Sequence, residues 1–268
     1  MKLQLRSVVV DYPGGIRALD GVDLTFEPGQ LVCLAGPNGS GKSTLLKTCA
    51  GLLEPTAGGV LLDERPLARL RPRERALRLA SVPQILQALP RTSVERFVLG
   101  GRYAHGTLLE RALGAPRPDD LAAVRRALAE ADAADLTQRR LDELSGGQRQ
   151  RVLVARALAQ EASILLFDEP TVMLDPAHQV LVFELIARAS AAGRTAVVAT
   201  HDLGLAGCFA DSLVLLDAGQ VRASGPPSEV LRPEILRPVY GEDLLFLSEA
   251  AGGQERTLVV PWPRGDAG

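Results

Sequence analysis

The chain has 268 residues, 46% of them hydrophobic and 23% charged, and a formal net charge of -2. This length predicts one or two domains with a sizeable core, and the near-neutral charge gives no electrostatic argument for nucleic acid as a partner. The sequence shows neither the apolar stretch of a signal peptide nor an apolar run long enough to cross a membrane. We therefore expect a cytosolic chain, which other subunits would have to hold if it works at a membrane.

The N-terminal part of the sequence predicts strands. Residues 3–34 are typical of short strands broken by turn signals at Pro13–Gly15 and Pro28–Gly29. Further strands are expected at 59–63 and 80–82.

A glycine-rich run follows the apolar residues 31–35 and precedes a helix-like stretch at 45–53. Strand, loop and helix in this order are the context that a phosphate-binding loop needs. The glycines allow successive backbone N–H groups to point inward, and the positive end of the helix faces the same point. The run consists of Gly36, Pro37, Asn38, Gly39, Ser40, Gly41, Lys42, Ser43 and Thr44.

Two side chains of this run indicate its ligand. Lys42 can supply a cation for the β- and γ-phosphates, and the Ser43 hydroxyl can bind Mg²⁺. The alternative is a glycine-rich turn that merely joins a strand to a helix. The full match in its strand–helix context favours the binding of a nucleoside triphosphate.

The middle of the chain, from about 92 to 159, is mostly helical in pattern, and 119–131 predicts an amphipathic helix. From residue 163 apolar runs alternate with helical stretches. This alternation predicts a mainly parallel sheet with helices on both faces, into which the helical part is inserted. The expected strands lie at 164–167, 195–199 and 212–216, and the expected helices at 177–192 and 206–209.

Two adjacent carboxylates, Asp168 and Glu169, follow the apolar run at 164–167. Ligands gather at the carboxyl ends of parallel strands, so we expect both acids to face the phosphate loop. Successive side chains of a strand point in opposite directions, but the turn at Pro170 can re-aim them. One acid can then hold the Mg²⁺ shell, and the next can orient or deprotonate the attacking water.

A second glycine-rich run opens the helical stretch that ends near Ala159. It consists of Leu144, Ser145, Gly146, Gly147 and Gln148. Ser145 is a good helix N-cap, and the two glycines leave backbone N–H groups exposed at the positive end of the helix. Taken alone, a Ser-Gly-Gly run before a helix is better explained as a flexible cap that binds nothing.

Together, the three motifs resemble those of the ATP-binding cassette family, which carries a Walker A loop, a signature motif and a Walker B strand in this order. The resemblance covers nearly the whole chain. It implies a P-loop NTPase core with a mainly parallel sheet, an N-terminal antiparallel β region and an inserted helical subdomain. We accordingly expect an ATPase domain over 1–241, with the helical subdomain at about 92–159, and a C-terminal extension of unknown role over 242–268.

The resemblance also implies roles for single residues. Tyr12 matches the aromatic side chain that stacks on adenine, and Gln84 matches the glutamine that senses Mg²⁺ and couples to the membrane partner. Asp175 matches an aspartate that acts across the dimer, and His201 the histidine that binds the γ-phosphate and orients the base. Without the resemblance, Tyr12 would be a half-buried strand residue, Asp175 the N-cap of the next helix, and His201 a structural histidine.

The family's mechanism joins two copies of the chain head to tail, so that Leu144–Gln148 of one copy closes over the ATP held by the other. ATP and Mg²⁺ are the implied cofactors, with Ser43, Gln84 and Asp168 around the metal. The implied catalytic residues are Glu169 as the base, with Lys42, Gln84 and His201.

Three stretches, 99–105, 174–179 and 225–231, are similar to those of family members that drive uptake of iron–siderophore, haem or cobalamin complexes. This likeness implies a second copy of the chain and integral membrane permease subunits as partners, and indirectly an extracytoplasmic substrate-binding protein. It places the chain on the inner face of the plasma membrane as a peripheral subunit, and it implies no nucleic acid.

Other functions remain open at this point. A soluble cassette of cluster assembly has a similar size, and an importer of another substrate class or an exporter cassette would share the same motifs. A GTPase is disfavoured because none of the lysines is followed two residues later by aspartate, as a guanine-reading motif requires.

Overall fold

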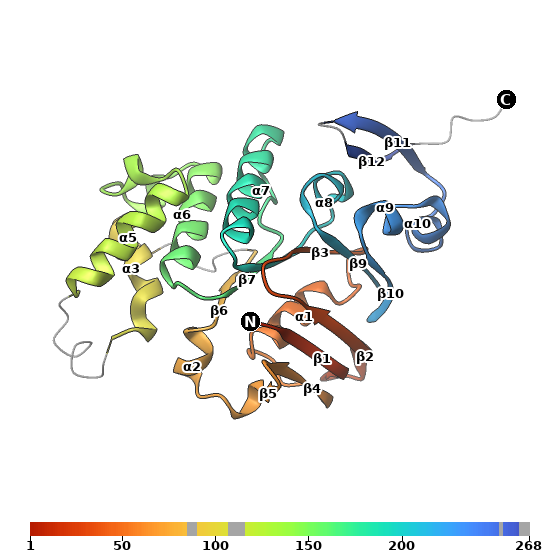
Figure 1. Ribbon diagram of the computed structural model, residues 1–268, viewed down its shortest axis with the longest axis horizontal. Coiled ribbons are helices and arrows are strands. Elements are labelled where there is room, and N and C mark those ends of the chain that lie inside the picture. Colours follow the sequence, from red (N-terminus) through yellow and green to blue (C-terminus); the bar gives the residue numbers. More distant parts are fainter. Residues whose placement is uncertain (85–89, 107–115, 252–253, 263–268) are drawn as a thin grey trace.

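The centre of the fold is a six-stranded sheet in the order β10-β9-β3-β8-β7-β6 (Figure 1). The computed structural model describes residues 1–84, 90–106, 116–251 and 254–262. Neighbouring strands from β9 to β6 are parallel, and β10 adds to β9 antiparallel, which confirms the prediction of a mainly parallel sheet. The strands are β3 (Leu31–Ala35), β6 (Leu79–Val82), β7 (Ile164–Asp168), β8 (Thr195–Ala199), β9 (Ser212–Asp217) and β10 (Gln220–Gly225).

The two faces of this sheet belong to two hydrophobic clusters. Because successive side chains of a strand point to opposite faces, Cys33 and Ala35 of β3 join one cluster, and Val32 and Leu34 join the other. All five residues of β3 are buried, as expected for a strand that is covered on both faces. The apolar runs that predicted these strands are therefore the core of the molecule.

A second, antiparallel sheet in the order β2-β1-β4-β5 covers one of these faces. Its strands are β1 (Leu3–Tyr12), β2 (Ile16–Phe26), β4 (Ala57–Leu62) and β5 (Arg65–Pro66). The N-terminal antiparallel region is thus confirmed, but the expectation of short strands was wrong, since β1 and β2 have 10 and 11 residues. Shifts in register, the first between Leu5 and Val8, interrupt the alternation without ending the strand.

The helices of the middle segment pack on one another beside the sheet (Figure 1). In the chain they come between β6 and β7, which are neighbours in the sheet. Val124 and Leu128 of α5 are buried, as the amphipathic pattern predicts. These elements are α3 (Val94–Leu99), η2 (Gly100–Ala104), α5 (Pro118–Glu130), η3 (Ala134–Leu136), η4 (Leu141–Glu143) and α6 (Gly146–Ala159).

The helices that connect the strands are α1 (Lys42–Cys49), α2 (Pro72–Ala76), α7 (Pro176–Ala191) and α8 (Leu203–Phe209), with the short η1 (Leu67–Arg69) before α2. Of these, α1, α7 and α8 lie within a few residues of their predicted positions, whereas α2 and η1 were not predicted. The helix after the phosphate loop starts earlier than expected, at Lys42, because Gly41 serves as its N-cap in the left-handed region with φ 105°.

The C-terminal part contains elements that the sequence pattern does not reveal. They are α9 (Pro227–Val230), α10 (Pro233–Tyr240) and a hairpin of β11 (Leu244–Ala251) and β12 (Gln254–Pro261). The hairpin packs on α8, where a Cβ atom at Gly207 would lie 2.7 Å from the carbonyl oxygen of Thr257. A glycine is needed at this contact. Within the described ranges, no helix has the length and apolar character that a membrane span requires.

Candidate nucleotide-binding site

The phosphate loop joins β3 to α1 and is shaped by glycine. Gly36 has φ 147°, and a Cβ atom at this position would lie 2.1 Å from the carbonyl oxygen of Leu216 in β9. Only glycine allows the backbone to leave β3 this close to the neighbouring strand. Tyr240 of α10 lies against the same point, with its hydroxyl facing the backbone of Gly36. Burial raises the pKa of this phenol to about 12.

Lys42 stands at the start of α1 and is 6% exposed. Its Nζ donates to the carbonyl oxygens of Gly36, at 2.7 Å, and Pro37, at 3.1 Å, so the ammonium lies against the first residues of the loop. Burial lowers the pKa of this ammonium, and the charges of Glu169 and Asp168 act against the decrease. The loop therefore holds a buried cation that forms no ion pair with the residues that the structure describes.

Ser43 and Asp168 meet across the sheet end, although 125 positions separate them. The Ser43 hydroxyl donates to Asp168 Oδ1 at 2.8 Å. Asp168 ends β7, at the same edge from which β3 enters the phosphate loop, because parallel strands bring their carboxyl ends together. A hydroxyl and a carboxylate oxygen are thus adjacent.

Glu169 is turned toward the site by its own backbone. Its φ of 49° lies in the left-handed region, and its N–H donates to the carbonyl oxygen of Ala199 at 3.0 Å. The sequence placed the change of direction at Pro170, whereas the structure makes it one residue earlier. The carboxylate, which is 8% exposed, lies 2.6 Å from Nδ1 of His201. An unusual backbone conformation at a carboxylate that pairs with a histidine is typical of a functional position.

A cavity of about 330 Å³ opens over the phosphate loop. It is lined by Tyr12, Ile16, Arg17, Ala18, Asn38, Gly39, Ser40, Gly41, Lys42, Ser43, Thr44, Gln84 and Glu169. Tyr12 reaches the loop through its hydroxyl, 3.3 Å from Thr44 Oγ1. Gln84 is exposed at the rim, and the five residues that follow it lie outside the described ranges.

Ile16 and Arg17 also line this cavity, although the sequence motifs did not indicate them. The turn at Pro13–Gly15 brings them back beside Tyr12, and the Ile16 side chain stays 65% exposed. The signal available in the sequence was the turn itself, since a hairpin places the residues on either side of it next to each other.

The signature run caps α6. Ser145 Oγ accepts from the N–H of Gln148 at 3.3 Å, and Gln148 Oε1 accepts from the N–H of Ser145 at 3.1 Å, which is a capping box. Ser145 and Gly146 are exposed, whereas Gly147 is buried. A Cβ atom at Gly147 would lie 2.3 Å from the ring of His178.

Asp175 caps the next helix, α7. Its Oδ1 accepts from the N–H of His178 at 3.0 Å, and its carboxylate lies 2.8 Å from the ring nitrogen Nδ1 of the same residue. The hydrogen bonds from His178 lower the pKa of Asp175. Because His178 also contacts Gly147, the structure links Asp175 to the signature run within one chain.

The predicted site residues thus form two separate groups. The phosphate loop, Tyr12, Gln84 and the acids after β7 share the cavity or its edge, together with His201. Among the described residues that line this cavity, none belongs to Leu144–Gln148, and Asp175 does not line it either.

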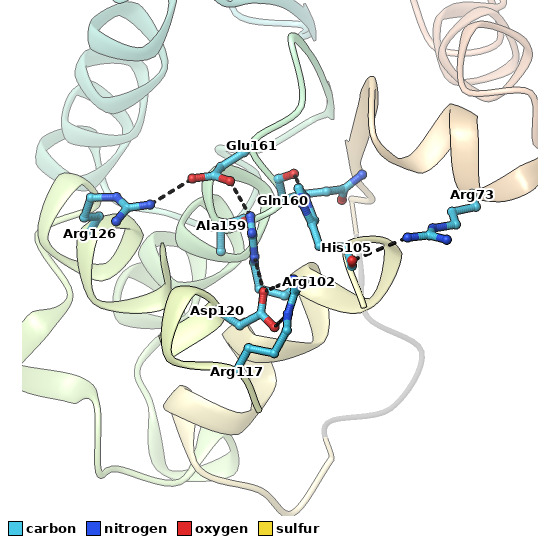
Figure 2. A network of polar contacts seen from close by, with 9 residues as sticks. All are labelled: Arg73, Arg102, His105, Arg117, Asp120, Arg126, Ala159, Gln160 and Glu161. Carbon is cyan, nitrogen blue, oxygen red and sulfur yellow. Dashed lines mark hydrogen bonds and ion pairs between the residues drawn. The ribbon is translucent and has the colours of Figure 1, made fainter. Parts of the chain in front are cut away.

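A network of charged side chains around the buried pair Arg102 and Asp120, at the C-terminal end of α6, was also missed (Figure 2). Arg102 of η2 is 7% exposed and lies 3.0 Å from Asp120 and 2.6 Å from Glu161. Arg117 and Arg126 complete the network, 2.9 Å from Asp120 and from Glu161 respectively. The Arg117 guanidinium beside Asp120 lowers the pKa of that carboxyl to about 2, against the effect of burial.

The family model described as ABC transporter matches residues 19–172. The chain is 41% identical over 263 residues to the hemin import ATP-binding protein HmuV of Nocardia farcinica, covering 96% of this chain and 89% of that protein.

Two solved structures are similar in fold. One, a transporter described as of the metal-chelate type in an inward-facing conformation, superimposes with a TM-score of 0.83 at 26% identity and covers 98% of both chains. The other, the dimeric bacterial ABC transporter cassette MJ0796, has a TM-score of 0.74 at 29% identity, covering 84% of this chain and 98% of that one.

Proposed function

Because this chain belongs to the ABC transporter family, we propose that it is the ATP-hydrolysing subunit of an importer that takes up a metal chelate. Haem is the first candidate, and cobalamin and iron–siderophore complexes belong to the same class. One observation carries the proposal: the phosphate loop and Glu169 line one cavity, Asp168 and His201 are bonded to the lining residues Ser43 and Glu169, and the signature run lies outside the cavity. The hemin-import relative supports an importer over a soluble cassette of cluster assembly.

ATP is bound by the loop from Gly36 to Thr44, with Lys42 on the β- and γ-phosphates. The ammonium is buried and already bonded to two carbonyl oxygens, so it needs little reorganisation to donate to a phosphate. Tyr12 offers its ring to the adenine at the rim of the cavity. Its contact with Thr44 and its half-buried position support this role.

The residues present fit a magnesium ion bound with the nucleotide. Ser43 and Asp168 bring two oxygens of the preferred kind to 2.8 Å from each other, and Gln84 lines the same cavity. Within the described ranges no group of three or more His, Cys, Asp or Glu side chains could hold a metal. This agrees with an ion that takes few protein ligands and several phosphate oxygens. When bound, Mg²⁺ neutralises charge on the phosphates.

Hydrolysis depends on Glu169. Its carboxylate accepts the proton of the water that attacks the γ-phosphate, and His201 holds the carboxylate in place through Nδ1 at 2.6 Å. The second ring nitrogen of His201 then remains for the γ-phosphate. The left-handed backbone at Glu169 and its burial support a position that is fixed before the substrate arrives.

A second copy of the chain completes the site. Ser145, Gly146 and Gly147 lie outside the cavity of their own chain, and the N–H groups of Gly146 and Gly147 at the start of α6 suit the γ-phosphate held by the partner. Closure adds donors and excludes water, and loss of the γ-phosphate reopens the dimer. The dimeric cassette among the similar structures supports this arrangement. Asp175 is linked to the signature run through His178, whose ring packs against Gly147.

The dimer is bound to integral membrane permease subunits on the inner face of the plasma membrane, and an extracytoplasmic binding protein delivers the chelate. No nucleic acid takes part. The metal-chelate type transporter, which matches this chain over 98% of both lengths, supports such an assembly.

The test is the variant Glu169→Gln. This change keeps the volume of the side chain and the phosphate loop but removes the base, so hydrolysis should fall by about 10²–10⁴-fold. ATP binding should be retained, and dimers should accumulate. Steady-state phosphate release, ATP binding and size-exclusion chromatography with ATP measure the three quantities. Glu184→Gln, at an exposed position of α7, is the matched control and should leave all three unchanged. Unchanged turnover in Glu169→Gln contradicts the assignment of the base.

The cargo is tested on the purified complex of the chain with its permease. Haem-loaded binding protein should stimulate ATP hydrolysis by this complex, and stimulation by a cobalamin or siderophore complex alone would change the cargo within the class. Absence of a permease from the complex would contradict the importer.

A further inference from the structure

Tyr240 is the last residue of α10, and its hydroxyl oxygen is buried without a hydrogen-bond partner among the described residues. Within the described ranges, four buried side-chain nitrogen or oxygen atoms share this condition, and two of them lie at Gly36. The Tyr240 hydroxyl faces the backbone of Gly36, and a Cβ atom at Gly36 would lie 2.6 Å from Ser40 Oγ. Because buried tyrosine hydroxyls usually find a partner, two such groups at one residue indicate a functional position.

Gly36 is the residue at which the backbone passes from β3 into the phosphate loop. Its carbonyl oxygen accepts from Lys42 Nζ at 2.7 Å. Its N–H takes part in none of the backbone hydrogen bonds that the described residues form outside the helices and strands. Since glycine has no Cβ atom to restrict rotation, a group that binds this N–H would also limit the movement of the carbonyl oxygen on the same residue.

The C-terminal elements fix the position of Tyr240 (Figure 1). Its ring packs against the hydrophobic core. Next to it in α10, the Arg237 guanidinium lies over the ring of Phe246 in β11, 6.0 Å from the ring centre, and 3.2 Å from Glu242. The other strand of the hairpin, β12, packs on α8, the helix that begins two residues after His201. The C-terminal part of the chain therefore contacts two segments that lead into the nucleotide site.

The Tyr240 hydroxyl remains protonated. Burial raises the pKa of this phenol, and the negative charge of Glu169 raises it further. The hydroxyl therefore does not compete with Glu169 for the proton of the attacking water. Its oxygen keeps lone pairs that can accept from an N–H group such as that of Gly36.

We propose that Tyr240 is a positioning residue of the nucleotide site: its hydroxyl accepts from the N–H of Gly36 when ATP is bound, and thereby fixes the carbonyl oxygen that orients Lys42. This inference deepens the proposed function and rests on it. Hydrogen bonds in catalytic sites often tighten only in the complex with substrate. The C-terminal hairpin, to which the sequence assigns no role, supports the phosphate loop by holding α10 in place.

The variant Tyr240→Phe tests the role of the hydroxyl, because it keeps the ring. Loss of one hydrogen bond should weaken ATP binding and raise KM about fivefold. The value of kcat should stay within about twofold, since the base Glu169 and its partner His201 are unchanged. ATP binding and steady-state phosphate release by the full chain measure these quantities. Tyr103→Phe, at an exposed position outside the nucleotide cavity, is the matched control and should change neither.

A double-mutant cycle tests whether Tyr240 acts through Lys42. In the background of Lys42→Ala, the orientation of the ammonium no longer matters, so Tyr240→Phe should change ATP affinity by less than about twofold. A loss of the same size in both backgrounds would mean that Tyr240 acts independently of Lys42, which refutes the proposal.

Urea unfolding distinguishes positioning from packing. Removing a buried hydroxyl that has no partner does not cost stability, so the free energy of unfolding of Tyr240→Phe should not fall below that of the parent chain. A fall in this free energy that accounts for the weaker ATP binding would show a packing role and refute the proposal.

The outcomes also separate this inference from the proposed function. If the parent chain binds and hydrolyses ATP and Tyr240→Phe does so with the same KM, the role of Tyr240 is refuted while the ATPase assignment stands. A parent chain that does not bind ATP refutes both.

Discussion

The two ends of α6 differ in how their free backbone groups are hydrogen-bonded. At its C-terminal end, the carbonyl oxygens of Ala159 and Gln160 accept from Arg102 and His105, each at 2.9 Å. At its N-terminal end, the cap satisfies the N–H groups of Ser145 and Gln148, but the N–H groups of Gly146 and Gly147 have no acceptor among the described residues.

Every helix leaves unsatisfied backbone groups at both ends, so this difference is informative. One end is bound into the molecule by buried side chains, and the other is exposed and carries unused donors. An end of the first kind contributes to stability, and an end of the second kind is available to a ligand such as a phosphate. Substitutions at the two ends should therefore affect different measured quantities.

The largest effect is expected from Gly146→Asp at the open end. A carboxylate at the first position of α6 stabilises the isolated helix end by about 0.3–1 kcal/mol through the helix dipole. It would also face the γ-phosphate in the proposed dimer, so we expect ATP hydrolysis to fall about a thousandfold. Phosphate release and urea unfolding measure the two effects, which should have opposite signs.

Gly146→Ala is the control, because a Cβ atom there would lie 3.6 Å from Leu174, an ordinary contact. It tests whether bulk alone lowers hydrolysis. If Gly146→Asp hydrolyses ATP within about tenfold of the parent chain, the open end is not a phosphate site.

Arg102→Met changes the anchored end. Removing one partner from a buried ion pair leaves Asp120 and the carbonyl oxygen of Ala159 with fewer donors, and we expect the free energy of unfolding to fall by about 3 kcal/mol. Arg126→Met provides the comparison, since this side chain is 61% exposed and should cost less than about 1 kcal/mol. If urea unfolding gives the same loss in free energy of unfolding for Arg102→Met and Arg126→Met, burial of the arginine does not contribute to stability.

The smallest effect is the pH dependence of the same network. The pKa of Asp120 is lowered to about 2 in the folded chain, so its contribution is fully present above the unfolded pKa, near 4, and is lost as the pH falls toward 2. The difference in free energy of unfolding between the parent chain and Asp120→Asn should shrink by about 1 kcal/mol from pH 6 to pH 3. A difference that stays constant over this range would mean that the carboxyl is not held ionised by Arg117.

The phosphate loop and the strand that ends at Asp168 could be predicted because their signals are local. A buried parallel strand is a short apolar run, and its carboxyl end lies at the edge where ligands bind, so adjacent residues in the sequence already indicate the position. The capping box at Ser145 is equally local, and the predicted helix start there was right. The direction of Glu169 was not predictable, since it depends on a left-handed backbone that the neighbouring strand β8 supports.

The sequence by itself determined that this chain is an α/β protein with a phosphate loop, a pair of carboxylates after a buried strand and a glycine-rich helix start. Only the tertiary structure decided what lies at the other end of that helix. Arg102 meets Asp120 and Glu161 from 18 and 59 positions away, whereas Arg156 meets no anion within the described residues. The physical reason is that periodicity reports which side chains are buried, but the partner of a buried charge depends on which distant segments the fold brings together.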